Sequence, residues 1–398
     1  MHTKQPSNNT PSGLPRARAL GIPLEGTPGA ANAITDVAGV AVGYVTLISG
    51  EGTMQGGRGP VRTGVTAILP RGRNGVGQSC AAGTHSFNGN GEMTGMAWID
   101  ESGAFSLPIL ITNTHAVGPC HRGVIDWVTQ HKPEVATQWL LPVVGETWDG
   151  YLNDINGSHV TPEHARLAID NASGGPIDEG SVGGGTGMNC YAFKGGSGTA
   201  SRLVDYGHRT YTVGVFLQAN FGARRELTIA GVPLGRALAA DNPMNDFFAG
   251  HATGAGSCIV VVATDAPLLP GQCKALARRV TLGLGRTGTA GSHFSGDIFI
   301  AFSTANAGAL DSRFPSGAPD HSSYAHMDFI PWGRMDDFYT AVVQAAEEAV
   351  LNSLVCNTDM VGRDGNRSPA LSHSAVRAAM ASRQVLQQSL AQISGLPN

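Results

Sequence analysis

Charged side chains are scarce in this chain of 398 residues. Asp, Glu, Lys and Arg make up 14%, against about 25% in a typical soluble domain. Lysine occurs only at positions 4, 132, 194 and 274, and no basic stripe is present. We therefore expect no nucleic-acid partner, because phosphate binding needs clustered Lys and Arg. No apolar run reaches the 18 or more residues of a membrane-spanning helix, so we expect no membrane segment either.

Cysteines are also few, and their spacing is uninformative for metal or redox chemistry. The six form no CxxC pattern and no close pairs, which predicts buried, reduced thiols. Residues 1–19 are polar and lack the apolar stretch that a secretory signal needs. We interpret them as a flexible N-terminal arm and expect a cytoplasmic protein.

Glycine and apolar residues dominate what remains. Glycine occurs 55 times and apolar residues make up 41%, which predicts a globular protein with a sizeable core, many tight turns and close backbone approaches. No repeat period and no clear linker divides the chain. We therefore expect residues 20–398 to form one domain of layered α/β packing.

Short apolar runs bounded by Gly and Pro predict strands, and amphipathic stretches predict helices. The run at 258–263 is apolar throughout, which is typical of a fully buried strand. Thr161 and Pro162 are suited to cap and open a helix. The predicted strands span 37–45, 63–69, 107–112, 212–219, 258–263 and 297–302, and the predicted helices span 162–171, 268–282, 338–354 and 374–393.

Several familiar motifs are matched by residues whose context does not support their usual function. Residues 283–288 match G-x-G-x-x-G, but they follow a predicted helix rather than a strand, so no dinucleotide site is expected. His115, Cys120 and His121 lack a further ligand at recognisable spacing, so we expect no metal. A cofactor is not expected either.

The segment 179–188 is a separate feature, because its five glycines in ten residues are more than a turn requires.

The junction Gly256-Ser257 lies where a small-residue loop meets the apolar strand. A serine hydroxyl can attack the preceding carbonyl, and glycine offers no side chain to hinder that approach. Hydrolysis of the resulting ester would free Ser257 as a new N-terminal residue. Its α-amine, with a pKa of about 7.7–8.0, would then be a base beside the hydroxyl. A Gly-Ser pair before a strand is common, so this pattern alone indicates little.

Further segments make the pattern specific. In chain order they are NAITDVAGVAVGY (32–44), ETWDGYLNDI (146–155), GSVGGGTGMNCYAFKGG (180–196), VGVFLQANFG (213–222), GAGSCIVVVATDAPLL (254–269) and GRTGTAGSHFSGDIFIAFSTAN (285–306). With them, the chain resembles the DmpA-type aminopeptidases, which include L-aminopeptidase/D-esterases and β-peptidyl aminopeptidases. The resemblance implies a self-cleaving precursor and a four-layer αββα sandwich similar to Ntn hydrolases. The fragments implied are an α chain, 1–256, and a β chain, 257–398.

The resemblance also implies roles for individual residues. Ser257 would be the nucleophile, with the cut at Gly256–Ser257. Ser295 and Asp297 match a second Ser and its acidic partner, which would support and orient the nucleophile. Side chains two apart on a strand share a face, so that spacing permits their contact. Asn220 matches the family's oxyanion donor.

On the substrate side, Glu146 matches the carboxylate that receives the free amine of the substrate. The family pattern has Tyr two positions later, where this chain has Trp148, with Tyr151 nearby. The implied substrates are small peptides, amides or esters with a free amine, and the implied assembly is a homo-oligomer, a tetramer of αβ units. We expect the pocket to be shaped by loops 85–95, 115–120 and 146–153.

Two alternatives remain open. Glutamate N-acetyltransferases share the self-cleaving architecture, although they use a Thr nucleophile where this chain has Ser257. A relative that never cleaves itself could instead serve as a binding scaffold. The sequence does not decide between α- and β-aminoacyl substrates, or between L and D centres.

Overall fold

The structure is a computed structural model that describes residues 8–247, 256–312, 314, 318–319 and 324–394. A four-stranded sheet has the strand order β1-β2-β5-β6, and a six-stranded sheet has the order β4-β3-β12-β11-β10-β9. The first consists of β1 (Ala41–Ser49), β2 (Val61–Leu69), β5 (Ile109–Asn113) and β6 (Val143–Thr147). The second consists of β3 (Cys80–Ser86), β4 (Ala104–Phe105), β9 (Gly196–Tyr206), β10 (Arg209–Asn220), β11 (Gly256–Thr264) and β12 (Ser295–Ser303).

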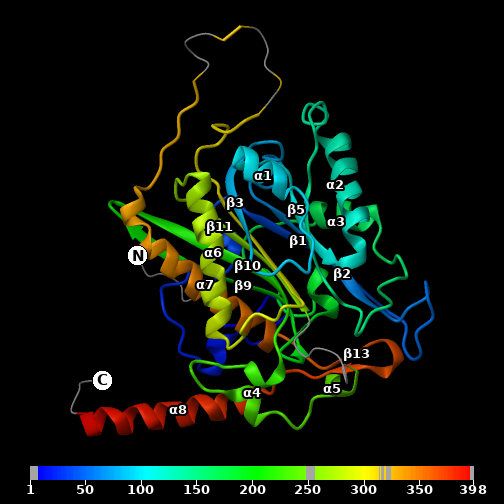
Figure 1. Cartoon of the computed structure of the whole chain (residues 1–398), viewed down its shortest axis with the longest axis vertical. Coiled ribbons are helices and arrows are strands. Elements are labelled where there is room, and N and C mark those ends of the chain that lie inside the picture. The colour runs from blue at the N-terminus through cyan, green and yellow to red at the C-terminus, as the bar shows by residue number, and fades with distance from the viewer. Residues whose placement is uncertain (1–7, 248–255, 313, 315–317, 320–323, 395–398) are drawn as a thin grey trace.

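Four longer helices cover the outer faces of these sheets (Figure 1). The helices α2 (Val117–His131) and α3 (Pro162–Asp170) pack on the four-stranded sheet, while α6 (Pro270–Arg286) and α7 (Asp336–Val355) pack on the six-stranded sheet. A further helix, α8 (His373–Ser394), lies near the C-terminus. The shorter elements are α1 (Met96–Ser102), α4 (Leu234–Ala237), α5 (Met244–Phe247), β7 (Asn189–Cys190), β8 (Phe193–Lys194), β13 (Met360–Val361) and β14 (Arg367–Ser368).

The hydrophobic core follows these layers. One cluster lies between the two sheets and includes Ile68 and Ile111 from one sheet and Phe216 and Ile259 from the other. A second cluster joins the six-stranded sheet to α6 and α7, and a third joins the four-stranded sheet to α2 and α3. The predicted αββα sandwich is therefore confirmed. The strand β11 is buried along nearly its whole length because it lies in the middle of this stack.

The apolar strands and the helices at 162–171, 268–282, 338–354 and 374–393 form within a few residues of their predicted bounds. The strand predicted at 37–45 is displaced to Ala41–Ser49, because Ile34–Asp36 forms a 3-10 helix and Gly39 turns the chain with a φ of 88°. The G-x-G-x-x-G run lies in the last turn of α6 and the residues after it. A Cβ on Gly283 would lie 2.6 Å from Cβ of Ala346, so this glycine brings α6 and α7 together.

The glycine-rich segment at 179–188 passes between the two sheets rather than forming a simple turn. Its centre is a buried 3-10 helix, Gly183–Gly187. A Cβ on Gly184 would lie 2.6 Å from the Ile111 carbonyl oxygen of one sheet, and one on Gly185 would lie 2.3 Å from the Ser197 nitrogen of the other. Only glycine permits this approach to both sheets.

The N-terminal segment differs from the flexible arm that we expected. Residues 8–19 pack against the domain, and Arg16 is 5% exposed. The Arg16 Nε lies 2.6 Å from Oε2 of the buried Glu179, and Ala17 is fully buried. Because its charge is paired inside the protein, this segment belongs to the folded domain. Residues 1–7 of the expected arm lie outside the described residues.

Two further expectations can be compared with the described residues. All six cysteines are buried and form no disulfide, as predicted. Within the described part of the chain, no helix has the length and apolar character needed to cross a membrane.

Candidate active site

Ser257 lies at the start of β11, in the middle of the six-stranded sheet, and is 2% exposed. The strand β11 runs antiparallel to β10 and parallel to β12. The register of these ladders places Ser257 opposite Asn220 on one side and Gly296 on the other. The fold thus brings together three segments that are far apart in sequence.

Ser295 and Asp297 lie on the neighbouring strand, β12, where they pair in register with Gly256 and Cys258. Both residues are buried, and Ser295 Oγ donates a hydrogen bond of 2.7 Å to Asp297 Oδ1. Asn88 Nδ2 donates to the other carboxylate oxygen at 3.0 Å. Burial raises the pKa of Asp297, and these two hydrogen bonds partly counter that effect. The predicted Ser–Asp contact is therefore present beside Ser257.

Asn220 is the last residue of β10, and its side-chain amide is held through its oxygen atom. Its Oδ1 accepts a hydrogen bond of 2.9 Å from the Asn189 backbone nitrogen. The Nδ2 atom has no hydrogen-bond partner among the described residues. This donor lies one strand away from Ser257, so it can stabilise a negative charge that forms beside the Ser257 hydroxyl during the reaction.

Lys194 fixes the peptide group that holds Asn220. It is fully buried in β8, and its Nζ donates to the carbonyl oxygens of Met188 and Gly195, each at 2.8 Å. The Met188 carbonyl and the Asn189 nitrogen belong to the same peptide group. Burial lowers the pKa of Lys194 to about 7. No sequence motif marks Lys194 as part of the site, because its partners are backbone atoms that only the fold brings close.

The four-stranded sheet contributes Glu146 near the end of β6 and Trp148 directly after it. The Trp148 backbone nitrogen donates to Ser257 Oγ at 3.3 Å. Glu146, near the end of β6, is 2% exposed; its Oε1 accepts from the Glu92 backbone nitrogen at 2.8 Å and its Oε2 accepts from the Thr114 hydroxyl. Burial raises the pKa of Glu146, and these hydrogen bonds limit the rise.

Tyr151 belongs to a cluster that packs against Trp148. It packs in a small cluster with Leu152 and Met244, and its hydroxyl donates to the Arg367 carbonyl at 3.1 Å. It is not among the described residues that line the cavity beside Asn220. Trp148 lines that cavity and packs against the Tyr151 cluster, so Trp148 is in the cavity wall and Tyr151 lies behind it.

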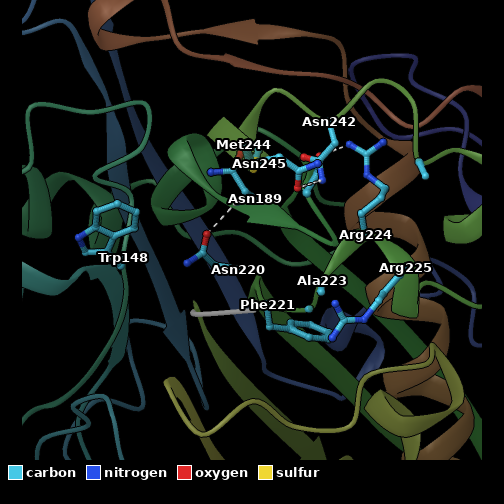
Figure 2. Close-up of a pocket in the computed structure, with 13 residues that line it drawn as sticks. Trp148, Asn189, Asn220, Phe221, Ala223, Arg224, Arg225, Asn242, Met244 and Asn245 are labelled. Carbon is cyan, nitrogen blue, oxygen red and sulfur yellow. Dashed lines mark hydrogen bonds between the residues drawn. The ribbon is translucent and has the colours of Figure 1, made fainter. Parts of the chain in front are cut away.

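A cavity of about 210 Å³ opens beside Asn220 and Trp148 (Figure 2). Its other walls come from β7 and the turn after it, from the segment after β10 and from the chain around α5. Of the loops that we expected to shape the substrate pocket, 146–153 reaches this cavity through Trp148. Loop 85–95 instead contacts Asp297 through Asn88 and Glu146 through the Glu92 nitrogen, and the described residues of loop 115–120 do not line the cavity. The lining residues that sequence analysis missed are Asn189, Ala192, Phe221, Gly222, Ala223, Arg224, Arg225, Ala239, Asn242, Met244 and Asn245.

No metal-binding cluster accompanies these groups. Among the residues that the structure describes, no three or more His, Cys, Asp or Glu side chains gather where they could hold an ion. The groups at the site are hydroxyls, amides and carboxylates, which suit acyl transfer through a serine.

A serine at the head of a central strand of an αββα sandwich is the arrangement of an Ntn-type hydrolase. Residues 32–368 match peptidase family S58, and the chain belongs to this family. It is accordingly a hydrolase of the serine aminopeptidase class.

Three relatives show how far the similarity extends. The chain is 50% identical over 377 residues to the beta-peptidyl aminopeptidase BapA of Sphingosinicella microcystinivorans, covering 92% of each chain. It is 44% identical to the solved L-aminopeptidase D-Ala-esterase/amidase of Ochrobactrum anthropi, with a TM-score of 0.84, over 93% of this chain and 99% of that one. A beta-aminopeptidase of Burkholderia sp. gives a TM-score of 0.82 at 41% identity, over 92% and 98% of the two chains.

Proposed function

We propose that the chain cuts itself once, between Gly256 and Ser257, and then uses Ser257 as an N-terminal nucleophile. One observation carries this proposal: Ser257 heads the central strand with Asn220 opposite it on β10 and the Ser295–Asp297 pair on β12. A nucleophile placed between an amide donor and a hydrogen-bonded carboxylate has the groups that acyl transfer needs.

In the first reaction, Ser257 Oγ attacks the Gly256 carbonyl carbon. The C–N bond of the scissile peptide breaks, the nitrogen takes up a proton, and an ester joins Gly256 to Oγ. Water then hydrolyses the ester, which leaves the Gly256 carboxylate and a free Ser257 with its own α-amine. The segment from residue 248 to 255, which precedes the cut, lies outside the described residues.

In the second reaction, the Ser257 α-amine takes the proton of its own hydroxyl, and Oγ attacks the substrate carbonyl. The Asn220 Nδ2 donates to the oxyanion that forms, and Ser295 with Asp297 orients the nucleophile. The Glu146 carboxylate receives the ammonium of the substrate, which places the first residue of the substrate over Ser257. The bond from the substrate carbonyl to its leaving group then breaks, the leaving group takes the proton held by the α-ammonium, and an ester remains on Oγ. Water hydrolyses this ester, which releases the first residue as a free acid and restores the enzyme.

We further propose that the residue released carries a β-amino group. Two relatives, 50% and 45% identical to this chain, are described as beta-peptidyl aminopeptidases. The solved relative from Ochrobactrum anthropi is described as an L-aminopeptidase and D-Ala-esterase/amidase, so α-aminoacyl amides and esters are the natural comparison substrates.

The two fragments would remain associated after the cut, because β11 of the second fragment pairs with β10 of the first. We also propose a cytoplasmic enzyme that assembles as a homo-oligomer, as a tetramer of such αβ units. Six buried thiols without a disulfide suit a reducing compartment. Sedimentation analysis of the mature protein tests the assembly.

The proposed function is tested with β-alanyl and L-alanyl p-nitroanilides, each free and N-acetylated. We expect release of nitroaniline from the free-amine compounds, fastest for β-alanyl, and almost none from the acetylated ones. Acetylornithine with glutamate is assayed beside them, because an acetyltransferase would transfer that acetyl group. Consumption of the acetylated compounds alone would contradict the aminopeptidase assignment, and an inactive scaffold would consume none.

A further inference from the structure

The order of the strands predicts how a substrate would lie across the site. Glu146 lies toward β12, because a Cβ on Gly91 would be 3.2 Å from Glu146 Oε1 and 3.0 Å from the Gly296 Cα. The cavity lies toward β10, since Asn220 and Phe221 line it. Ser257 on β11 is between these two strands. A substrate with its amine at Glu146 and its carbonyl at Ser257 therefore points its leaving group into the cavity.

The cavity offers two buried hydrogen-bond acceptors. Asn189 Oδ1 and Asn242 Oδ1 have no hydrogen-bond partner within the described part of the chain. The amide nitrogen of Asn242 is already engaged, since it donates to Asn245 Oδ1 at 2.9 Å. An unpartnered buried acceptor is costly, so these oxygens fit the N–H groups of a bound molecule.

Two arginines of the cavity differ in what they contact. Arg224 is buried, stacks on the Phe193 ring at 3.4 Å and donates to the carbonyls of Tyr191, Ala192 and Leu238. Arg225 is exposed and makes no hydrogen bond or ion pair with the described residues. Figure 2 shows Arg224 and Arg225 on the side of Asn220 away from Trp148.

Two acidic side chains of this region, Glu226 next to Arg225 in sequence and Asp241 near Arg224, have partners other than Arg225. The neighbouring Glu226 accepts a hydrogen bond from the Ala223 nitrogen at 2.9 Å. Asp241 forms an ion pair with Arg367. Among the described residues that line the cavity, the Arg225 guanidinium has no bound partner and can bind an anion, and guanidinium groups bind carboxylates well.

We propose that this cavity is the subsite for the leaving group and that Arg225 binds the free carboxylate of the residue released. The preferred substrates are then short peptides, above all dipeptides, that end in a free acid just beyond the cleaved bond. A volume of about 210 Å³ leaves room for a small leaving group of roughly one residue. This inference rests on the proposed aminopeptidase function and on Glu146 as the amine site.

The test compares β-alanyl-glycine with β-alanyl-glycinamide, which differ only in the terminal carboxylate. We expect the wild-type enzyme to favour the acid in kcat/KM, and Arg225→Gln to reduce this preference by about fivefold, a modest effect because the side chain is exposed. Arg225→Lys should retain part of the preference, and Arg225→Glu should reverse it. The preference of the wild type should also fall as salt is raised, since exposed charge pairs are screened.

The matched control is Arg209→Gln, which removes the same charge from the far end of β10. This variant should keep the acid-to-amide ratio of the wild type. Each protein is first checked on a denaturing gel for complete self-cleavage. The salt series needs no variant, so a poorly folded substitution does not prevent the test.

A second substrate distinguishes an error about Arg225 from an error about the aminopeptidase function. Hydrolysis of β-alanyl p-nitroanilide, which has no carboxylate, reports the aminopeptidase itself. If the anilide is cleaved and the acid-to-amide ratio is the same in every variant and at every salt concentration, the role of Arg225 is refuted. If no aminoacyl compound is cleaved, the proposed function is refuted and the inference with it.

Discussion

The side-chain amide of Asn220 is anchored through its oxygen, and its nitrogen remains available beside Ser257. If this nitrogen donates to the oxyanion, Asn220→Ala removes an interaction made mainly in the transition state. We expect kcat to fall by roughly 10²–10³ with little change in KM. Steady-state kinetics on protein shown to be fully cleaved makes the comparison fair, and unchanged kcat in such protein would remove Asn220 from the mechanism.

The carboxyl group of Glu146 predicts a pH dependence. Burial raises its pKa above the usual value, so it becomes neutral at a higher pH than an exposed glutamate does. A neutral Glu146 cannot attract the substrate ammonium. We therefore expect kcat/KM for free-amine anilides to show a further fall at acid pH, below the fall caused by protonation of the Ser257 α-amine, with a pKa above that of an exposed glutamate.

Glu146→Gln tests that assignment. It should lose this acid limb, act weakly on free-amine substrates and discriminate less against N-acetylated ones. A full pH profile of kcat/KM for both proteins provides the measurement. If the Gln variant retained the wild-type profile, another group would have to hold the amine.

At the scale of single elements, the start of β11 depends on a glycine. A Cβ on Gly256 would lie 2.0 Å from the Asn220 carbonyl oxygen and 3.0 Å from the Phe221 Cα, closer than real side chains come. Gly256→Ala should therefore displace the start of β11 from β10 and slow self-cleavage markedly. A time course of precursor loss on denaturing gels measures the rate.

Gly285→Ala is the matched control, because a Cβ there meets nothing within 4 Å and alanine favours the helix α6. It should be cleaved at the wild-type rate. Equal cleavage rates for both alanine variants would show that close packing at Gly256 does not govern the reaction.

Element by element, the sequence was informative where apolar residues decide the structure. The run of β11 and the amphipathic α7 appear close to their predicted bounds. The strand β3 and the helix α2 were missed, because their glycines serve packing: a Cβ on Gly83 would meet α6 at 2.4 Å, and one on Gly123 would meet α3 at 2.5 Å. Such glycines weaken the local signal of a strand or helix.

For the site too, some residues could be predicted from the sequence and others could not. The motifs carry Ser257, Asn220, Ser295, Asp297 and Glu146, which the strand register and β6 bring to one region. The cavity could not be predicted, because its walls are distant segments that become neighbours only in the fold. The sequence does not show that Arg224 is bound to backbone carbonyls whereas Arg225 has no partner among the described residues. Only their contacts in the structure distinguish the two arginines.

At the scale of the whole molecule, a buried charge cluster would join the two proposed fragments. Glu348 lies in the second fragment and pairs with Arg18 and Arg202 of the first at 2.8 and 2.7 Å. Although burial alone would raise the pKa of Glu348, these arginines lower it. Glu348→Gln leaves the buried Arg202 without its counter-charge, which should destabilise the mature protein by about 3–5 kcal/mol.

Urea unfolding of the cleaved protein measures that loss. Glu347→Gln is the control, because Glu347 pairs with the half-exposed Arg286 of its own fragment and should cost less than about 1 kcal/mol. Equal losses in the two variants would mean that the buried cluster does not hold the fragments together.

The most direct test of the whole account is the mass and N-terminal sequence of the purified protein under denaturing conditions. We expect two fragments, residues 1–256 and 257–398, the second beginning with Ser257, and a single inactive full-length chain for Ser257→Ala. A wild-type preparation that remains one intact chain and still hydrolyses β-alanyl p-nitroanilide would contradict it.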